Sequence, residues 1–127
     1  MNRAHTIVVG DTHMYWPALL RALHHFRPEV CIVAGDFGWW PAQWEVLPKE
    51  RRLEFLLEGK PRFTEIRFID GNHEDLDELF GETVEPRRLH EAVELRPRLW
   101  YQPRGSMMTF ADGRRMLCIG GGKSVDA

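Results

Sequence analysis

Three segments of the chain each end in side chains that can bind a metal ion or transfer a proton. Asp11 and His13 close the first segment, Asp36 lies in the second, and Asn72 and His73 lie in the third. Carboxylate, imidazole and amide groups, with no thiolate among them, form a donor set that suits Mn, Fe or Zn. The residue types therefore predict a divalent metal site assembled from three separate loops.

The same residues allow a division of roles between two metal ions. Asp11 and His13 stand two residues apart in one loop, so both side chains can reach a single cation. Asp36 can bridge two ions because each carboxylate oxygen has spare lone pairs, and Asn72 offers an amide oxygen to the second ion. Two ions ~3.5–4 Å apart can hold a bridging hydroxide and clamp a phosphoryl group for in-line attack. His73 would then act as an acid or base at the edge of the site rather than as a ligand.

The elements that precede these loops have the pattern of buried strands. The segments 6–13, 30–38 and 65–73 each begin with a short apolar run rich in β-branched residues, which favours strands covered on both faces in a parallel sheet. Helical patterns at 15–28 and 48–61 separate the three segments. This alternation predicts an α/β fold, in which ligands collect at the carboxyl ends of the strands.

The other segments carry weaker signals. Residues 74–81 are predicted to form a short helix whose acidic first turn suits the helix dipole. Residues 93–105 are predicted to be a loop with short strands, and residues 106–121 to be two strands joined at Asp112-Gly113. The segment 35–48 is predicted to be a long aromatic loop, unusual enough to indicate a place near a site.

The three polar loops resemble the signature of the calcineurin-like metallophosphoesterases. The ordered motifs of that family are DxH, then GD, then GNH followed by Asp or Glu, and here they occupy 11–13, 35–36 and 71–74. Each motif alone is weak, but the ordered set, with each motif at the end of a strand, is specific and covers residues 6–76. The GDFG at 35–38, the GNHE and the glycine-rich stretch at 120–126 are similar to a bacterial branch of the family.

The resemblance implies a fold and a domain organisation. The family fold is an αββα sandwich, and this chain would hold its N-terminal half, a parallel βαβαβ core followed by a C-terminal β-hairpin. Residues 1–127 would be a single metallophosphoesterase-like domain that ends before the late histidine motifs of the family. A second copy in a homodimer, or a C-terminal segment, would then complete the site.

The resemblance also assigns roles to individual residues. Asp11 and His13 would bind the first metal, Asp36 would bridge both metals, and Asn72 would bind the second. His73 would protonate the leaving oxygen or stabilise the transition state. The sequence departs from the common GDxxD pattern at its last position, which is Trp39 here, so a supporting carboxylate is missing from that place.

These roles predict a metal-dependent phosphoesterase that uses two divalent ions, Mn, Fe or Zn, and a bridging hydroxide. Its substrate would be a phosphomonoester or phosphodiester, with nucleotides among the candidates. The alternative is a truncated, catalytically inactive binding or regulatory domain that keeps the loops without the full site. Tight stoichiometric binding of two metal ions would argue against the second hypothesis, and weak or single-metal binding would support it.

Composition excludes several other classes of protein. The 127 residues carry a formal net charge of −2 with mixed signs, which argues against a general nucleic-acid coat or a binder of anionic membranes. Cys31 and Cys118 lie in apolar runs, so two buried reduced thiols are expected rather than a disulfide framework. No signal peptide or membrane span is evident, which predicts a cytoplasmic protein with no membrane partner.

Three further features have two interpretations each. Glu74 either tunes the site or begins a helix, and the helix is favoured. An aromatic group could stack on a base or cover the edge of the core, and the core is favoured; its members are Tyr15, Trp16, Trp39, Trp40 and Trp44. An arginine group could meet phosphate or form a solvated face; its members are Arg87, Arg88, Arg96, Arg98 and Arg104.

Overall fold

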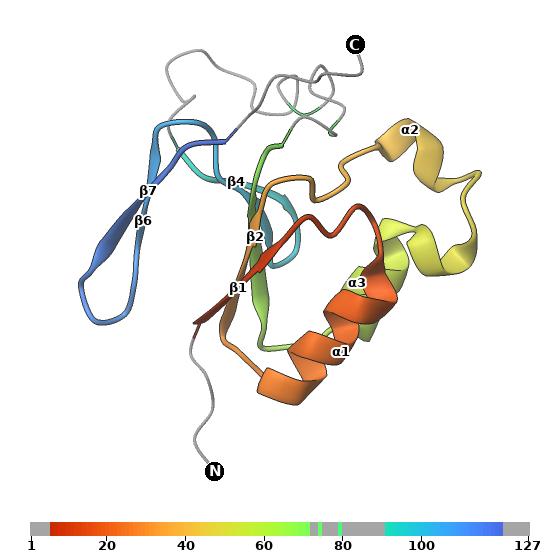
Figure 1. Ribbon diagram of the computed structural model, residues 1–127, viewed down its shortest axis with the longest axis horizontal. Coiled ribbons are helices and arrows are strands. Elements are labelled where there is room, and N and C mark those ends of the chain that lie inside the picture. Colours follow the sequence, from red (N-terminus) through yellow and green to blue (C-terminus); the bar gives the residue numbers. More distant parts are fainter. Residues whose placement is uncertain (1–5, 72–73, 75–78, 80–90, 121–127) are drawn as a thin grey trace.

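The structure, a computed structural model, describes residues 6–71, 74, 79 and 91–120 and builds most of them around one five-stranded sheet (Figure 1). In spatial order the strands are β1 (Thr6–Gly10), β2 (Val30–Ala34), β3 (Glu65–Ile69), β5 (Leu99–Tyr101) and β4 (Val93–Arg96). β1, β2, β3 and β5 run parallel to one another, and β4 pairs antiparallel with β5 at one edge. A two-stranded sheet follows, formed by β6 (Ser106–Thr109) and β7 (Arg115–Cys118).

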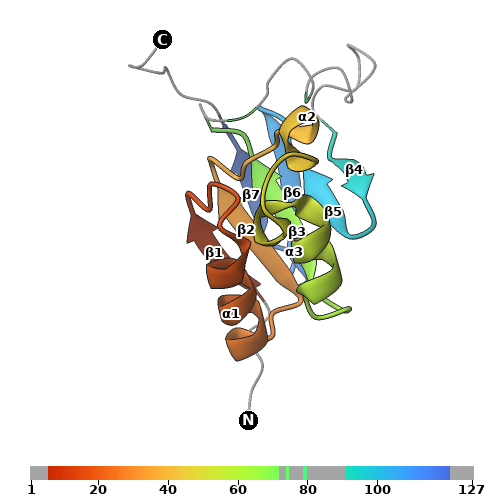
Figure 2. The same cartoon turned by 90° about the vertical axis from the view of Figure 1, so that its right-hand side faces the viewer.

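The helices cover one face of the five-stranded sheet. The longer ones, α1 (Trp16–Phe26) and α3 (Leu53–Gly59), lie across β1, β2 and β3 in Figure 2, while the β6–β7 hairpin lies on the opposite face. Two short turns, α2 (Pro41–Trp44) and η1 (Lys49–Arg51), connect β2 to α3. Among the residues described, no helix has the length and apolar character that a membrane crossing requires.

The predicted α/β class is confirmed, with the parallel βαβαβ core and the C-terminal hairpin in the expected places. The hairpin turns at Asp112-Gly113, where Gly113 has a φ of +88° that suits glycine. Two local predictions were incomplete. The segment 35–48 contains the helical turn α2, and residues 93–105 supply β4 and β5, of which β5 adds a fourth parallel strand. The helix predicted at 74–81 lies largely outside the described residues.

The helix face of the sheet carries the larger core. Along β3, Ile66 and Phe68 point into it and are fully buried, as strand alternation requires. The ring of Phe68 stacks on Phe37 at a centroid distance of 4.4 Å, and Trp16 from α1 packs against Phe37 at 4.9 Å. The aromatic residues that follow β2 therefore belong to the same core as the strand that precedes Asn72.

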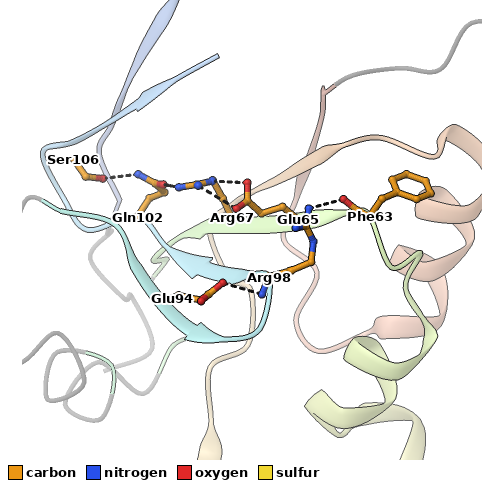
Figure 3. Close-up of polar contacts among 7 residues, drawn as sticks. All are labelled: Phe63, Glu65, Arg67, Glu94, Arg98, Gln102 and Ser106. Carbon is orange, nitrogen blue, oxygen red and sulfur yellow. Dashed lines mark hydrogen bonds and ion pairs between the residues drawn. The ribbon is translucent and has the colours of Figure 1, made fainter. Parts of the chain in front are cut away.

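The hairpin face is smaller and more polar. Ile32 packs there with Met108 and Cys118 of the hairpin. Arg67 also points to this side, where its guanidinium bonds both carboxylate oxygens of Glu65 at 3.1 and 3.2 Å and the Gln102 side-chain oxygen at 2.6 Å (Figure 3). Gln102 in turn donates to the Ser106 hydroxyl at 2.9 Å, so a chain of polar side chains joins β3 to the start of the hairpin (Figure 3).

The register of the parallel strands decides where their loops emerge. Gly10 is paired with Ala34, and Ala34 is paired with Ile69, so β1, β2 and β3 end level with one another. The loops after β1 and β2 leave the same end of the sheet, the upper end in Figure 1. This common end is where the sequence predicts the metal ligands.

Candidate metal centre

The first ligand loop is a tight, left-handed turn at the end of β1. Asp11, His13 and Met14 all have positive φ angles, of 48°, 47° and 62°. Three hydrogen bonds attach this turn to the loop after β2, and each ends on the main chain there. The His13 N–H donates to the Asp36 carbonyl at 2.8 Å, and the Thr12 hydroxyl and the Met14 N–H donate to the Phe37 carbonyl at 3.0 and 3.1 Å. The two loops are therefore held as one unit by main-chain geometry.

The second ligand loop turns just as sharply. Gly35 has a φ of +88° and Asp36 a φ of 47°, so the chain reverses immediately after β2. Glycine adopts this conformation at no steric cost, so Gly35 permits the sharp turn directly before Asp36. Gly38 has a φ of +108°, and a Cβ there would lie 2.3 Å from Cγ of Met14, so only glycine lets the two loops approach this closely.

These turns bring Asp11, His13 and Asp36 together. One ligand atom from each of the three lies within 4.8 Å of the others, and His13 Nε2 is 3.6 Å from Asp36 Oδ2. Asp11 and His13 are exposed, and the Asp36 side chain retains 14% of its exposure, so the group opens to solvent. Two carboxylates and an imidazole in this arrangement fit a borderline or hard divalent cation.

Of the six described non-glycine residues with a positive φ, four lie in these two loops, and they include Asp11, His13 and Asp36. Each has a left-handed conformation, which costs L-residues roughly 1–2 kcal/mol. Such conformations persist where the surrounding structure enforces them, and they gather at functional sites. The agreement between donor chemistry and strained backbone at Asp11, His13 and Asp36 identifies this end of the sheet as the candidate site.

The third loop reaches the group through Gly71. Its Cα packs against the Asp36 loop so closely that a Cβ at position 71 would lie 2.1 Å from Asp36 Oδ1 and 2.4 Å from the Asp36 nitrogen. Gly71 is thus required for this close approach of the two loops. Asn72 and His73 lie outside the described residues, and their roles as second-metal ligand and proton donor remain predictions from the sequence.

Glu74 joins two of the loops, and whether it also begins a helix lies outside the described residues. Its carboxylate is buried and accepts three main-chain hydrogen bonds, from Gly38, Trp39 and Gly71 at 2.5, 3.2 and 2.7 Å. Burial raises the pKa of this carboxyl, an effect that the three N–H donors oppose and the nearby Asp36 charge adds to. Glu74 therefore ties two site loops together, and it lies in a bend of the chain.

Asp70, the residue directly after β3, is a second buried carboxylate. It accepts a hydrogen bond from the Tyr101 hydroxyl at 2.7 Å and is paired with Arg104 at 2.8 Å. Burial and the bond to Asp70 raise the pKa of Tyr101. Gly120 also lies against Asp70, because a Cβ there would be 2.6 Å from the Asp70 carbonyl oxygen. Asp70 thus attaches the end of β3 to the loop after β5 and to the start of the predicted glycine-rich stretch.

The aromatic group mostly belongs to the core, as the favoured interpretation held. Trp16 and Trp39 are fully buried, and Trp39 meets Trp44 edge-on at 5.0 Å. Tyr15 differs, since 62% of it is exposed, and it follows the His13 turn directly in sequence.

The arginine group is divided among structural contacts. Arg104 pairs with Asp70, Arg98 donates to the Phe63 carbonyl at 2.6 Å, and the Arg96 guanidinium lies 5.5 Å from the Trp39 ring centre. Arg87 and Arg88 are outside the described residues. A cation near the site comes instead from Arg51, which donates to the His13 carbonyl at 3.3 Å and was not singled out from the sequence.

A large cleft lies at the other end of the strands. Its volume is about 1040 Å³, and it opens between the first residues of β1, β2 and β3, namely Thr6, Val30 and Glu65, and the tip of the hairpin. Because the three strands are parallel, this cleft and the Asp11 group are separated by the length of the strands. The donor group at the carboxyl ends, rather than the cleft, is the position where chemistry is expected.

Comparison with known proteins assigns the family. The family model for calcineurin-like phosphoesterases matches residues 4–127, and so the chain belongs to the calcineurin-like phosphoesterase family. Searches among curated proteins and among solved structures found no match. Membership of this family is consistent with the α/β fold and with the candidate metal group of Asp11, His13 and Asp36.

Proposed function

We propose that this protein is a metal-dependent phosphoesterase that hydrolyses a phosphomonoester or phosphodiester, with nucleotides among the candidate substrates. The observation that carries the proposal is the convergence of Asp11, His13 and Asp36, whose ligand atoms lie within 4.8 Å of one another at the carboxyl ends of β1 and β2. Membership of the calcineurin-like phosphoesterase family supports the same reaction class.

In this proposal each side chain has one task. Asp11 and His13 would hold the first divalent ion, and Asp36, whose Oδ2 lies 3.6 Å from His13 Nε2, would bind both ions. Asn72 contributes to the second position, and His73 holds the proton that the leaving oxygen receives or stabilises the transition state. The bound ions supply Lewis acidity, which neutralises phosphoryl charge and activates water. Mn, Fe and Zn all suit the donor set.

The main-chain contacts around the donors support this assignment. The turn at 11–14 is joined to the turn at 35–38 through the His13 and Met14 N–H groups. The candidate metal-binding side chains are therefore fixed relative to one another before an ion binds. Sites that do chemistry need such prior order, because an ordered site avoids reorganisation during the reaction. The alternative, a binding or regulatory domain without catalysis, would require only the ion-binding part of this arrangement.

The test uses the 127-residue chain loaded with Mn²⁺ and two probes, p-nitrophenyl phosphate and bis(p-nitrophenyl) phosphate. We expect hydrolysis of at least one probe and stoichiometric Mn²⁺ binding. Asp36→Asn should lower both Mn²⁺ affinity and hydrolysis by on the order of 10²-fold or more, because even outer partners of metal ligands contribute roughly 10–100-fold.

Asp112→Asn is the matched control. This variant makes the same change from carboxylate to amide, but on the exposed hairpin turn. Asp112 contacts Arg114 there and not the site. It should leave hydrolysis and Mn²⁺ binding unchanged. Weak or single-ion Mn²⁺ binding without hydrolysis of either probe would favour the regulatory alternative. Hydrolysis that Asp36→Asn leaves unchanged would contradict the proposed role of this site.

A further inference from the structure

Glu74 is a buried carboxylate outside the predicted ligand set. Its side chain is one of the few charged groups in the interior of the described residues, with 4% of its surface exposed. Oε1 accepts the N–H groups of Gly38 and Trp39, and Oε2 accepts the N–H of Gly71. One side chain therefore joins the loop after β2 to the loop after β3.

Asp36 lies at the junction of those two loops. The Asp36 carbonyl receives the His13 N–H, and the Asp36 carboxylate lies against Gly71, where no side chain would fit. Gly38, two residues beyond Asp36, is bonded to Glu74 and pressed against Met14. The position of the Asp36 carboxylate thus depends on contacts that Glu74 holds in place.

The chemistry of Glu74 suits positioning better than simple packing. A buried carboxylate is costly unless hydrogen bonds compensate it, whereas an apolar side chain would fill the same space without that cost. Charge-assisted bonds to main-chain N–H groups are shorter and stronger than neutral ones, and they fix direction as well as distance. Three such bonds from two loops give Glu74 control over how those loops meet.

We propose that Glu74 is a positioning residue that fixes the Asp36 carboxylate for metal binding by joining the Gly38–Trp39 and Gly71 main chains. The inference rests on the proposed function for the role of Asp36 itself. In this role Glu74 would act through the backbone of the two loops rather than as a metal ligand.

Glu74→Gln tests the idea with almost no change of shape. An amide has one acceptor oxygen, so it can serve Gly38 and Trp39 or Gly71 but not both sets. We expect Mn²⁺ affinity, measured by isothermal titration calorimetry on the whole chain, to fall roughly 10–100-fold, the range for outer partners of metal ligands. With an active chain, kcat at moderate Mn²⁺ should fall while KM for the aryl phosphate changes little, and excess Mn²⁺ should restore part of kcat.

Glu54→Gln is the matched control, because Glu54 is exposed on α3 and the variant loses the same charge. It should bind Mn²⁺ as the parent chain does. Wild-type affinity in Glu74→Gln, with the parent binding Mn²⁺ normally, would overturn the inference and leave the proposed function intact. Absence of Mn²⁺ binding and hydrolysis in the parent would instead overturn the proposed function.

A second variant covers the case in which Glu74→Gln does not fold. Glu74→Asp keeps the charge and both acceptor oxygens but is one methylene shorter, so it cannot reach both loops at the observed distances. We expect cooperative thermal unfolding together with weakened Mn²⁺ binding. Wild-type affinity in this variant, or loss of cooperative unfolding in both variants, would overturn the inference, since Glu74 would then serve the fold as a whole.

Discussion

The two faces of the five-stranded sheet are built in different ways, and Phe37, the neighbour of Asp36, packs into the core of only one of them. On the helix face, Phe68 and its aromatic neighbours form a continuous core that includes Phe37, the residue after Asp36. On the hairpin face, Val8 is 63% exposed, and Ile32 packs in a small cluster beside the Arg67 chain of polar contacts. The difference indicates that the core on the helix face positions the loops that carry Asp11, His13 and Asp36. Substitutions in the hairpin should then affect these loops less.

The largest expected effect comes from removing a ring on the helix face. Phe68 contacts Phe37, Trp39 and Tyr101 with centroid distances of 4.4, 6.1 and 5.4 Å. Phe68→Ala should lower the free energy of unfolding by ~3–5 kcal/mol, as cavity-forming changes at buried aromatic residues do. Urea denaturation followed by circular dichroism measures this loss. Mn²⁺ binding should weaken as well, because the support under Phe37 is removed.

Met108→Ala makes the corresponding cavity on the hairpin face, where Met108 packs on Ile32. The free energy of unfolding should fall by ~2 kcal/mol, the lower end of the range for buried methionine. Mn²⁺ affinity should be unchanged. Equal losses of Mn²⁺ affinity in the two variants would contradict the idea that the helix face alone positions the site.

Two glycines sharpen the comparison at an intermediate scale. Gly38 and Gly113 both have positive φ, but a Cβ at position 38 meets Met14 Cγ at 2.3 Å and the Met14 nitrogen at 2.8 Å, while position 113 has nothing within 4 Å. Gly113→Ala should therefore cost only the left-handed strain, about 1 kcal/mol. Gly38→Ala should cost more, by ~1–3 kcal/mol, the typical penalty of overpacking, and should also weaken Mn²⁺ binding. Thermal unfolding and Mn²⁺ titration of both variants provide the measurement.

The smallest expected effect is a pH dependence carried by the cysteines. Burial raises the pKa of Cys31, in the helix-face core, from 9.0 to about 12. Between these two values the unfolded chain releases the thiol proton and the folded chain keeps it, so stability falls as pH rises. The slope approaches about 1.4 kcal/mol per pH unit for one thiol. The unfolding temperature measured from pH 8 to pH 10 should drop less steeply in Cys31→Ala than in the parent.

Cys118 provides the comparison on the hairpin face. Burial raises its pKa too, but hydrogen bonds from Ser106 and Gln102 oppose the shift. Cys118→Ala should therefore flatten the pH dependence less than Cys31→Ala does. The reverse order would show that the hairpin face shields its thiol as fully as the helix face.

Much of this fold follows from short-range sequence patterns. The strands before Asp11, Asp36 and Asn72 are apolar runs with clear ends. The pair Asp112-Gly113 is enough to predict the hairpin turn. β5 was harder to predict, because three residues between Pro97 and Pro103 carry too little pattern to show that they join the parallel sheet. Its partner strand, β3, lies more than thirty residues away in sequence.

The candidate site divides in the same way. The convergence of Asp11, His13 and Asp36 was predictable because parallel strands place their carboxyl ends together. The role of Glu74 was not, because its partners Gly38 and Trp39 are 36 and 35 residues away and are main-chain groups that leave no mark on residue identity. An acidic residue before a helical pattern carries the same local signal whether it caps a helix or crosses to another loop.

At Asp11, His13 and Asp36 the side chain needed for metal binding occupies a left-handed backbone conformation that lowers stability. Asp and His are among the side chains that enter this conformation most often after glycine, yet glycine would occupy it at lower energy. A glycine at any of the three positions would relax the backbone and remove a donor in the same step. Consensus or directed-evolution screens that reward heat resistance alone would therefore erase this group, so its residues are best held fixed when the rest of the chain is stabilised.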